Sequence, residues 1–236
     1  MAYEDTMNLD APERQLLAIV GELEVRPLDW ATGAVVRSTP NALVRRGELL
    51  LGTAKLSWDG AFDSLVRRGL LVRRSGSYSI ADGARDLARR VRRELASQLF
   101  GDRLVRAAMS PTYREFCTRV FGPGLWAFSL IDHQQIAALV DALALSPDQR
   151  CLDVGCAVGS LSRHVAQATG AHVRGVDIAA GAIALAQERY GNDPLLSFQC
   201  VDANDLSTLG GQYHAIMAID SLYFLDDLDE TVAGLR

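Results

Sequence analysis

The sequence predicts an α/β protein, with a parallel sheet of about four strands preceded by a mostly α-helical domain. In the second half of the chain, short apolar runs alternate with segments of helical period. A glycine-rich turn begins at Gly155, directly after the first of these runs. The charge also divides the chain, because residues 1–120 hold 19 Lys and Arg against 15 Asp and Glu, whereas residues 121–236 hold 5 against 14.

Residues 1–100 show the order of elements that is typical of a winged helix. Apolar residues at helical spacing predict helices at Glu13–Leu23 and Ala42–Leu51, and Ser57 is placed to cap a third helix. Two β-prone runs then flank the polar break at Ser75–Ser77, which predicts a hairpin. A basic amphipathic helix follows at Ala84–Phe100. We therefore expect a winged-helix-like N-terminal domain.

Residues 101–130 are expected to form a helical linker or lid, and residues 131–236 the sheet domain. Pro111 precedes a helix at Tyr113–Val120, and the apolar period of Ile131–Leu145 predicts the helix that leads into the sheet. The predicted strands and intervening helices are, in chain order, Cys151–Val154, helix Ser160–Thr169, His172–Val176, helix Ala179–Tyr190, Leu195–Val201 and Tyr213–Ile219.

The strongest motif is Cys151–Gly159, in which a strand runs into a glycine-rich turn that opens a helix. Glycines let a ligand approach the backbone, and the helix N-terminus offers unpaired N–H groups, a geometry that would also suit a dinucleotide. However, Ala157 and Ser160 stand where the dinucleotide pattern requires glycine. Asp153 adds a carboxylate, which repels a pyrophosphate and attracts the cationic methionine portion of S-adenosylmethionine.

Acidic residues also end the next three strands. Asp177, 22 residues after Gly155, is placed to accept both ribose hydroxyls of a nucleoside. Asp202 is placed to accept a hydrogen bond from the exocyclic amine of a purine, and Asp220 lies beside the expected reacting centre. Because ligands bind at the carboxyl ends of the strands in open α/β sheets, we expect these side chains to line one site.

From Gln149 to about Leu235 the sequence resembles the class I S-adenosylmethionine-dependent methyltransferases. The resemblance implies a Rossmann-like sheet, S-adenosyl-L-methionine as cofactor, and a partial methyltransferase domain over residues 131–236. It implies cofactor contacts at the following residues: Asp153, Gly155, Cys156, Ala157, Gly159, Asp177, Ile178, Asp202, Ala203 and Asp220. Ala157 departs from the family, which most often has glycine there, and we expect this small change to be tolerated.

A second departure concerns the extent of the sheet. The family's sheet has seven strands, whereas this sequence stops at Arg236, inside the helix after the fourth strand. We expect either that the sequence is a fragment or that another chain covers the apolar edge of that strand. The cofactor site would survive, whereas the substrate pocket would be incomplete.

The remaining reactive residue types give weaker signals. The four histidines share no metal-ligand spacing, so no metal site is predicted, and His133 is a weak candidate for a general base. Cys156 and Cys200 are interpreted as small buried apolar residues rather than nucleophiles. Three aromatic residues are candidates for a lid over the cofactor, with packing between the two regions as the alternative: Phe121, Trp126 and Phe128.

Composition excludes several classes of protein. The acidic N-terminus lacks the apolar segment of a signal peptide, and no uncharged apolar run reaches the roughly 18 residues of a membrane span. The four cysteines show neither CxxC pairing nor the dense spacing of a secreted scaffold. We expect a cytoplasmic protein without a membrane partner, in which the N-terminal region is a candidate surface for a homodimer.

The first functional hypothesis is a methyltransferase with a small-molecule acceptor. The arginines of Arg67–Arg106 leave two alternatives, an RNA or DNA methyltransferase and a cofactor-sensing winged-helix regulator that binds DNA. Two features count against nucleic acid. The arginines are interleaved with apolar positions, as on a solvated face, and no Asn-Pro-Pro-Tyr or Asp-Pro-Pro-Tyr motif follows the fourth strand.

Overall fold

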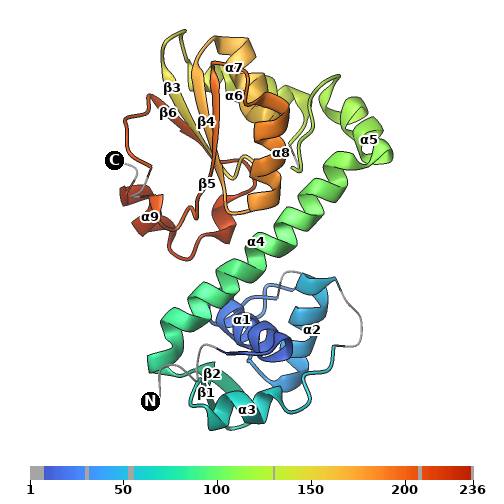
Figure 1. Cartoon of the computed structure of the whole chain (residues 1–236), viewed down its shortest axis with the longest axis vertical. Helices are drawn as coiled ribbons and strands as arrows, with labels where there is room; N and C mark the ends of the chain where they lie inside the picture. Colours follow the sequence, from blue (N-terminus) through green and yellow to red (C-terminus); the bar gives the residue numbers. More distant parts are fainter. Residues whose placement is uncertain (1–7, 30–31, 53–55, 130, 207–208, 235–236) are drawn as a thin grey trace. The chain divides into compact units, whose positions relative to one another are not determined.

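The chain divides into two compact units, residues 1–96 and residues 97–236. A computed structural model describes residues 8–29, 32–52, 56–129, 131–206 and 209–234 (Figure 1). The division falls inside one long helix, and each unit has a hydrophobic core of its own. The proposed boundary at residue 100 and the separate linker at 101–130 stay predictions.

The first unit contains three helices followed by a hairpin, in the predicted order. The elements are α1 (Ala11–Val25), α2 (Pro40–Leu51), α3 (Ala61–Arg67), β1 (Leu71–Arg74) and β2 (Ser77–Ile80). Leu16, Leu17, Val20 and Leu23 lie on one side of α1 and are at most 1% exposed, because they form the centre of this unit's core.

The third helix begins later than the sequence suggested. Ser57 does not cap it, because its hydroxyl donates to Asp59 instead, at 2.7 Å. Gly60, in the left-handed region at φ +81°, occupies the N-cap position of α3. The helix is held against α1 by Glu13, which accepts hydrogen bonds from Ser64 at 2.6 Å and from Arg68 at 3.0 Å.

The basic helix is longer than predicted. A short turn, η1 (Asp82–Ala84), leads into α4 (Arg85–Met109), which passes Phe100 and continues through Gly101. A Cβ atom at Gly101 would lie 3.7 Å from the backbone nitrogen of Gly181. This is an ordinary van der Waals distance, so α4 packs against the start of α8 here and continues past the helix end that the sequence pattern suggested.

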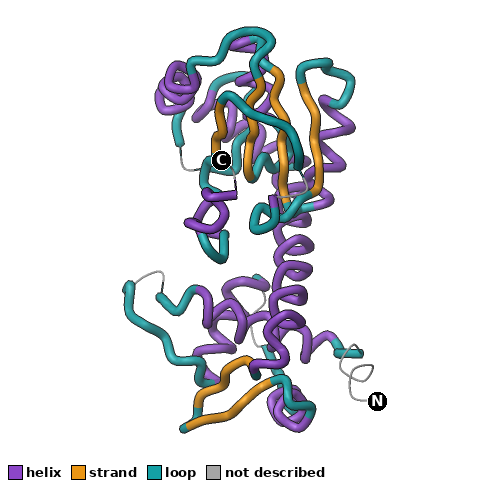
Figure 2. The backbone as a smooth tube through the Cα atoms, turned by 90° about the vertical axis from the view of Figure 1, so that its left-hand side faces the viewer, coloured by secondary structure: helices purple, strands orange, loops and turns teal. Residues whose placement is uncertain are grey.

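The second unit is built on a parallel sheet. After α5 (Pro111–Phe121) and α6 (His133–Leu143), four strands alternate with helices: β3 (Arg150–Val154), α7 (Ser160–Thr169), β4 (His172–Asp177), α8 (Ala180–Tyr190), β5 (Leu196–Cys200) and β6 (Ala215–Met217). The strand order is β5-β4-β3-β6, and every described pairing in this sheet is parallel (Figure 1). Figure 2 shows the strands of this sheet in orange. The predicted α/β class with a Rossmann-like sheet is confirmed.

Alternate residues of each strand face opposite sides of this sheet. On one side Cys151, Val173 and Phe198 pack against α7 and α8, and on the other Leu152, Val154 and Val176 form a smaller cluster. The chain then passes through η3 (Leu222–Phe224) to α9 (Leu228–Gly234). Among the described residues, the structure contains no helix with the length and apolar character needed to cross a membrane.

Candidate functional site

The glycine-rich turn lies at the carboxyl end of β3, between that strand and α7. The backbone N–H groups of Gly155 and Cys156 both donate to the carbonyl of Val176 on β4, at 2.8 and 3.0 Å. Three residues of the turn have positive φ, namely Gly155 (+83°), Ala157 (+49°) and Gly159 (+75°). The turn is thus fastened to the neighbouring strand and built from left-handed backbone, which favours glycine.

Two of these glycines also have no room for a side chain. A Cβ atom at Gly155 would lie 2.4 Å from Cβ of Ser221, and one at Gly159 would lie 2.6 Å from the ring of Phe198. Ser221 in turn donates from its hydroxyl to the carbonyl of Val154, at 2.6 Å. The turn after β3 and the segment after β6 are therefore in direct contact.

Asp177 connects two backbone segments at the carboxyl end of β4. One carboxylate oxygen accepts from the N–H of Ala157 in the glycine-rich turn, and the other from the N–H of Ala179, both at 2.8 Å. Burial raises the pKa of Asp177, although these backbone donors lower it in part. A carboxylate has about four lone-pair positions, so two backbone bonds leave acceptor capacity for a ligand.

Asp153 lies in a different environment from the one expected for a residue that faces a ligand. It is only 2% exposed, and it accepts a hydrogen bond from the hydroxyl of Ser162 on α7, at 2.6 Å. Burial raises its pKa to about 7; the Ser162 bond opposes this shift, and the charge of Asp177 adds to it. In this structure Asp153 is therefore a buried partner of α7, close to Asp177, and not an exposed charge.

Asp202 and Ala203 follow β5, as predicted. Asp202 accepts from the backbone and side-chain nitrogens of Asn204, at 2.9 and 2.8 Å, and Asn204 accepts from the backbone of Asp226 at 2.7 Å. This turn thereby links the end of β5 to the segment that precedes α9. Ala203 is partly buried against the smaller cluster under the sheet.

Asp220 follows β6 in a conformation that is unusual for its residue type. Its φ is +52°, and its carboxylate accepts from the hydroxyl of Ser129, at 2.7 Å. Ser129 comes from the segment between α5 and α6, 91 residues away in sequence. It is a site residue that sequence reasoning missed, because a lone serine in a loop carries no periodic signal.

The three aromatic residues do not form one lid. Phe121 is buried in the core beneath α5, and Phe128 is 55% exposed. Trp126 lies against two guanidinium groups, with those of Arg189 and Arg114 at 4.3 and 4.8 Å from a ring centroid. Its ring therefore already has cationic partners, which disfavours the predicted contact with a sulfonium.

The other predicted site residues divide into buried and exposed groups. Cys156 is buried, and burial raises the pKa of its thiol well above the usual value, as expected for an inert apolar residue. Cys200 is exposed, so the prediction of burial was wrong for it. His133 is exposed at the start of α6. Ile178 follows β4, and its backbone carbonyl accepts a hydrogen bond from the hydroxyl of Ser97, at 2.6 Å.

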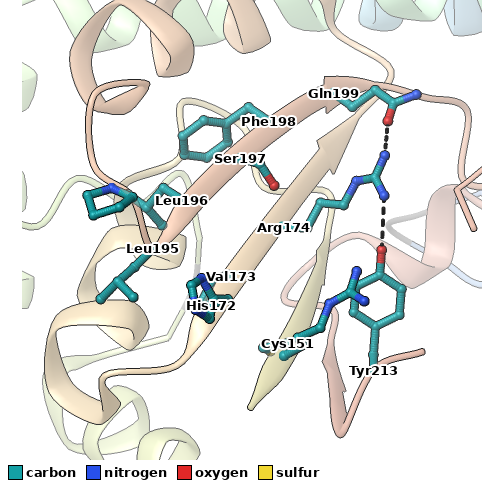
Figure 3. Close-up of a pocket in the computed structure, with 12 residues that line it drawn as sticks. Cys151, His172, Val173, Arg174, Leu195, Leu196, Ser197, Phe198, Gln199 and Tyr213 are labelled. Atoms are coloured by element: carbon teal, nitrogen blue, oxygen red, sulfur yellow. Dashed lines mark hydrogen bonds between the residues drawn. The ribbon is translucent and has the colours of Figure 1, made fainter. Parts of the chain in front are cut away.

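A cavity of about 280 Å³ lies beside β3, β4 and β5, and its lining follows β5 from Leu196 to Gln199 (Figure 3). Arg174 projects into it, donates to the carbonyl of Leu209 at 2.7 Å and to the hydroxyl of Tyr213 at 3.3 Å, and contacts Gln199. Residues 155–159 and the strand-end acids Asp153, Asp177, Asp202 and Asp220 do not line this cavity, although Phe198, which lies against Gly159, does.

Comparison with known proteins identifies the second half of the chain. Residues 151–236 match the family described as methyltransferase domain, and they contain the glycine-rich turn and all four strand-end acids. Residues 151–236 are therefore similar to methyltransferase domains. This agrees with the parallel β5-β4-β3-β6 sheet and with the family resemblance of the sequence.

Curated relatives of the chain are named as methyltransferases. The chain is 31% identical over 97 residues to methyltransferase GfsG of Streptomyces halstedii, and 35% identical over 133 residues to magnesium-protoporphyrin O-methyltransferase of Synechocystis sp.. These matches cover 40% and 50% of this chain, and 35% and 55% of the relatives. The chain thus spans between about a third and about half of their length.

Among solved structures, the chain is similar to phosphoethanolamine N-methyltransferase 2 of Haemonchus contortus. That protein was solved with phosphomonomethylethanolamine and S-adenosylhomocysteine. The TM-score is 0.45 at 23% identity, over 58% of this chain and 32% of the other.

Substitution of Gly155 tests the contact between the turn and Ser221. We expect Gly155→Ala to lower the free energy of unfolding by about 1–3 kcal/mol more than Gly124→Ala does, as measured by urea denaturation. Gly124 is the matched control, because its φ of +84° is almost the same as the +83° of Gly155, but a Cβ there would meet no atom within 4 Å. Equal losses in the two variants would show that the close contact contributes nothing.

Substitution of Asp153 tests the environment of the buried carboxyl group. Because its pKa is raised from 3.8 to about 7, the folded chain holds a proton that the unfolded chain releases between these pH values. Stability should therefore fall as pH rises through this window. We expect Asp153→Asn, which keeps an acceptor for Ser162, to be more stable than the wild type by roughly 2–4 kcal/mol at pH 8 and by little at pH 4.

The measurement is the melting temperature of both proteins from pH 4 to pH 8. Asp141→Asn serves as control, because it removes an exposed carboxylate from α6 of the same unit. A difference between wild type and Asp153→Asn that stays constant with pH would rule out the raised pKa.

Proposed function

We propose that this protein transfers a methyl group from S-adenosylmethionine to a small-molecule acceptor. The observation that carries this proposal is the connection between Asp177 and the glycine-rich turn, within a segment that matches a methyltransferase domain. The turn brings backbone close to a ligand, and the adjacent carboxylate has acceptor capacity for ribose hydroxyls. This combination suits a nucleoside that carries no pyrophosphate.

The residues that would hold the cofactor occupy the carboxyl ends of four neighbouring strands. Asp177 would accept from the ribose, Asp202 from the purine amine, and the backbone of Gly155 would lie against the methionine portion. The cofactor supplies an activated methyl group on a sulfonium. The chain's own contribution is orientation, because displacement at that carbon needs the acceptor atom in line with the leaving sulfur.

The names of the relatives support a small-molecule acceptor. They include an O-methyltransferase for magnesium-protoporphyrin and N-methyltransferases for phosphoethanolamine. Because these acceptors differ in size, charge and acceptor atom, they favour the class of small molecules and no particular compound. Nucleic-acid binding, a homodimer through the first unit, and a base at His133 stay predictions from the sequence.

Cofactor binding is tested by calorimetry with S-adenosylhomocysteine. We expect Asp177→Ala to weaken binding by about 10- to 100-fold, since hydrogen bonds to a charged group contribute about 1.5–3 kcal/mol. Asp193→Ala, in the turn between α8 and β5, is the control and should bind as the wild type does. Equal affinities of wild type and Asp177→Ala, or no binding by the wild type, would contradict the proposed site.

A further inference from the structure

The segment 125–129 is anchored to the proposed cofactor site at two points. The backbone N–H of Trp126 donates to the hydroxyl of Ser160, the first residue of α7, at 2.8 Å. The hydroxyl of Ser129 donates to Asp220, after β6, at 2.7 Å. One anchor thus follows the glycine-rich turn directly, and the other lies next to Ser221, which contacts that turn.

The hydroxyl of Ser129 has a defined direction. Its oxygen accepts a hydrogen bond from the backbone N–H of Ile131, at 3.2 Å, so its proton points to Asp220. The preceding residues are also held, because Leu125 and Ala127 are buried and the carbonyl of Ala127 accepts from the hydroxyl of Tyr113, at 2.9 Å. Ser129 therefore extends from a well-supported segment.

Asp220 is held in a conformation that an isolated aspartate rarely adopts. A left-handed residue other than glycine costs about 1–2 kcal/mol, although Asp and Asn tolerate it better than most. The cost is offset locally by the hydrogen bond from Ser129 and by the bond from Ser221 to Val154. Backbone strain that the surroundings maintain at a strand end is a reason to look for a function.

The other strand-end acids are engaged in ways that differ from that of Asp220. Asp153 is buried against Ser162, and Asp177 bonds to two backbone amides. Asp202 bonds to Asn204, beyond β5, two strands away from β3. Asp220 follows β6, which is the strand next to β3. The next residue, Ser221, contacts Gly155 of the glycine-rich turn.

We propose that Asp220, oriented by Ser129, is the carboxylate that recognises the positive charge of the methyl donor. This inference rests on the proposed function. It assigns Ser129 as a positioning residue, and it transfers charge recognition from Asp153, where the sequence suggested it, to Asp220. The consequence is selectivity, because S-adenosylmethionine carries a sulfonium charge and S-adenosylhomocysteine does not. A site with an oriented carboxylate binds the donor in preference to the product.

The test is a binding measurement that needs no acceptor. The affinities of S-adenosylmethionine and S-adenosylhomocysteine are determined by calorimetry for the wild type and for four variants, and their ratio is compared. We expect Asp220→Asn to reduce the preference for the donor about tenfold and Ser129→Ala about threefold, whereas Ser129→Thr, which keeps the hydroxyl, retains it. Asparagine also tolerates positive φ, so Asp220→Asn removes charge without adding strain.

Asp141→Asn is the fourth variant and the matched control, because it removes an exposed charge of the same sign from the same unit. Its ratio should equal that of the wild type. An unchanged ratio in Asp220→Asn and Ser129→Ala, or equal losses for both ligands in Ser129→Ala, would overturn the inference while leaving the proposed function in place. Absence of binding of either ligand to the wild type would overturn both.

Discussion

The contact between Gly155 and Ser221 is the constraint on which the rest of the site depends. A Cβ atom at Gly155 would lie only 2.4 Å from Cβ of Ser221. The turn after β3 and the segment after β6 are therefore so close that position 155 has room for the hydrogen of glycine and for no side chain. This closeness places Ser221 within reach of the carbonyl of Val154, and it brings Asp220 beside the glycine-rich turn. Strand pairing between β3 and β6 is parallel, so both segments emerge at the same edge of the sheet.

Buried polar groups give this edge its electrostatic character. Asp153 and Asp177 are close enough that the charge of one raises the pKa of the other, and both are shielded from water. Because its pKa is raised to about 7, Asp153 carries only part of a negative charge at neutral pH. That this edge binds a positively charged ligand stays a prediction, and Asp153 lies in a more buried environment than the one expected for a residue that contacts such a ligand.

Much of the sheet was predictable because parallel strands between helices produce long apolar runs with clear boundaries. β3 and β4 were predicted to within one residue at each end, and α7 was predicted with its observed bounds. The predicted helix ends were wrong where contacts between segments far apart in sequence determine them. The helix α4 continues through Gly101, which packs against Gly181, and Gly60 takes the N-cap position that Ser57 was expected to fill.

The site was predictable in position but only partly in detail. Spacing located the acids at strand ends, whereas the side-chain directions of Asp153 and Ser129 depend on packing between segments far apart in sequence. The contact of Ser162 with Asp153 could have been predicted from the sequence, because Ser162 follows the turn on the face of α7 that meets β3. No pattern in the sequence pointed to Ser129.

Ala157 adds a property to the turn that a glycine at the same place would lack. Its φ of +49° is strained for alanine, and its amide is held by Asp177. Because the alanine methyl group disfavours this left-handed backbone, the hydrogen bond from the Ala157 amide to Asp177 also offsets strain in the turn. A glycine at the same place would need no such support to hold the turn in its observed shape.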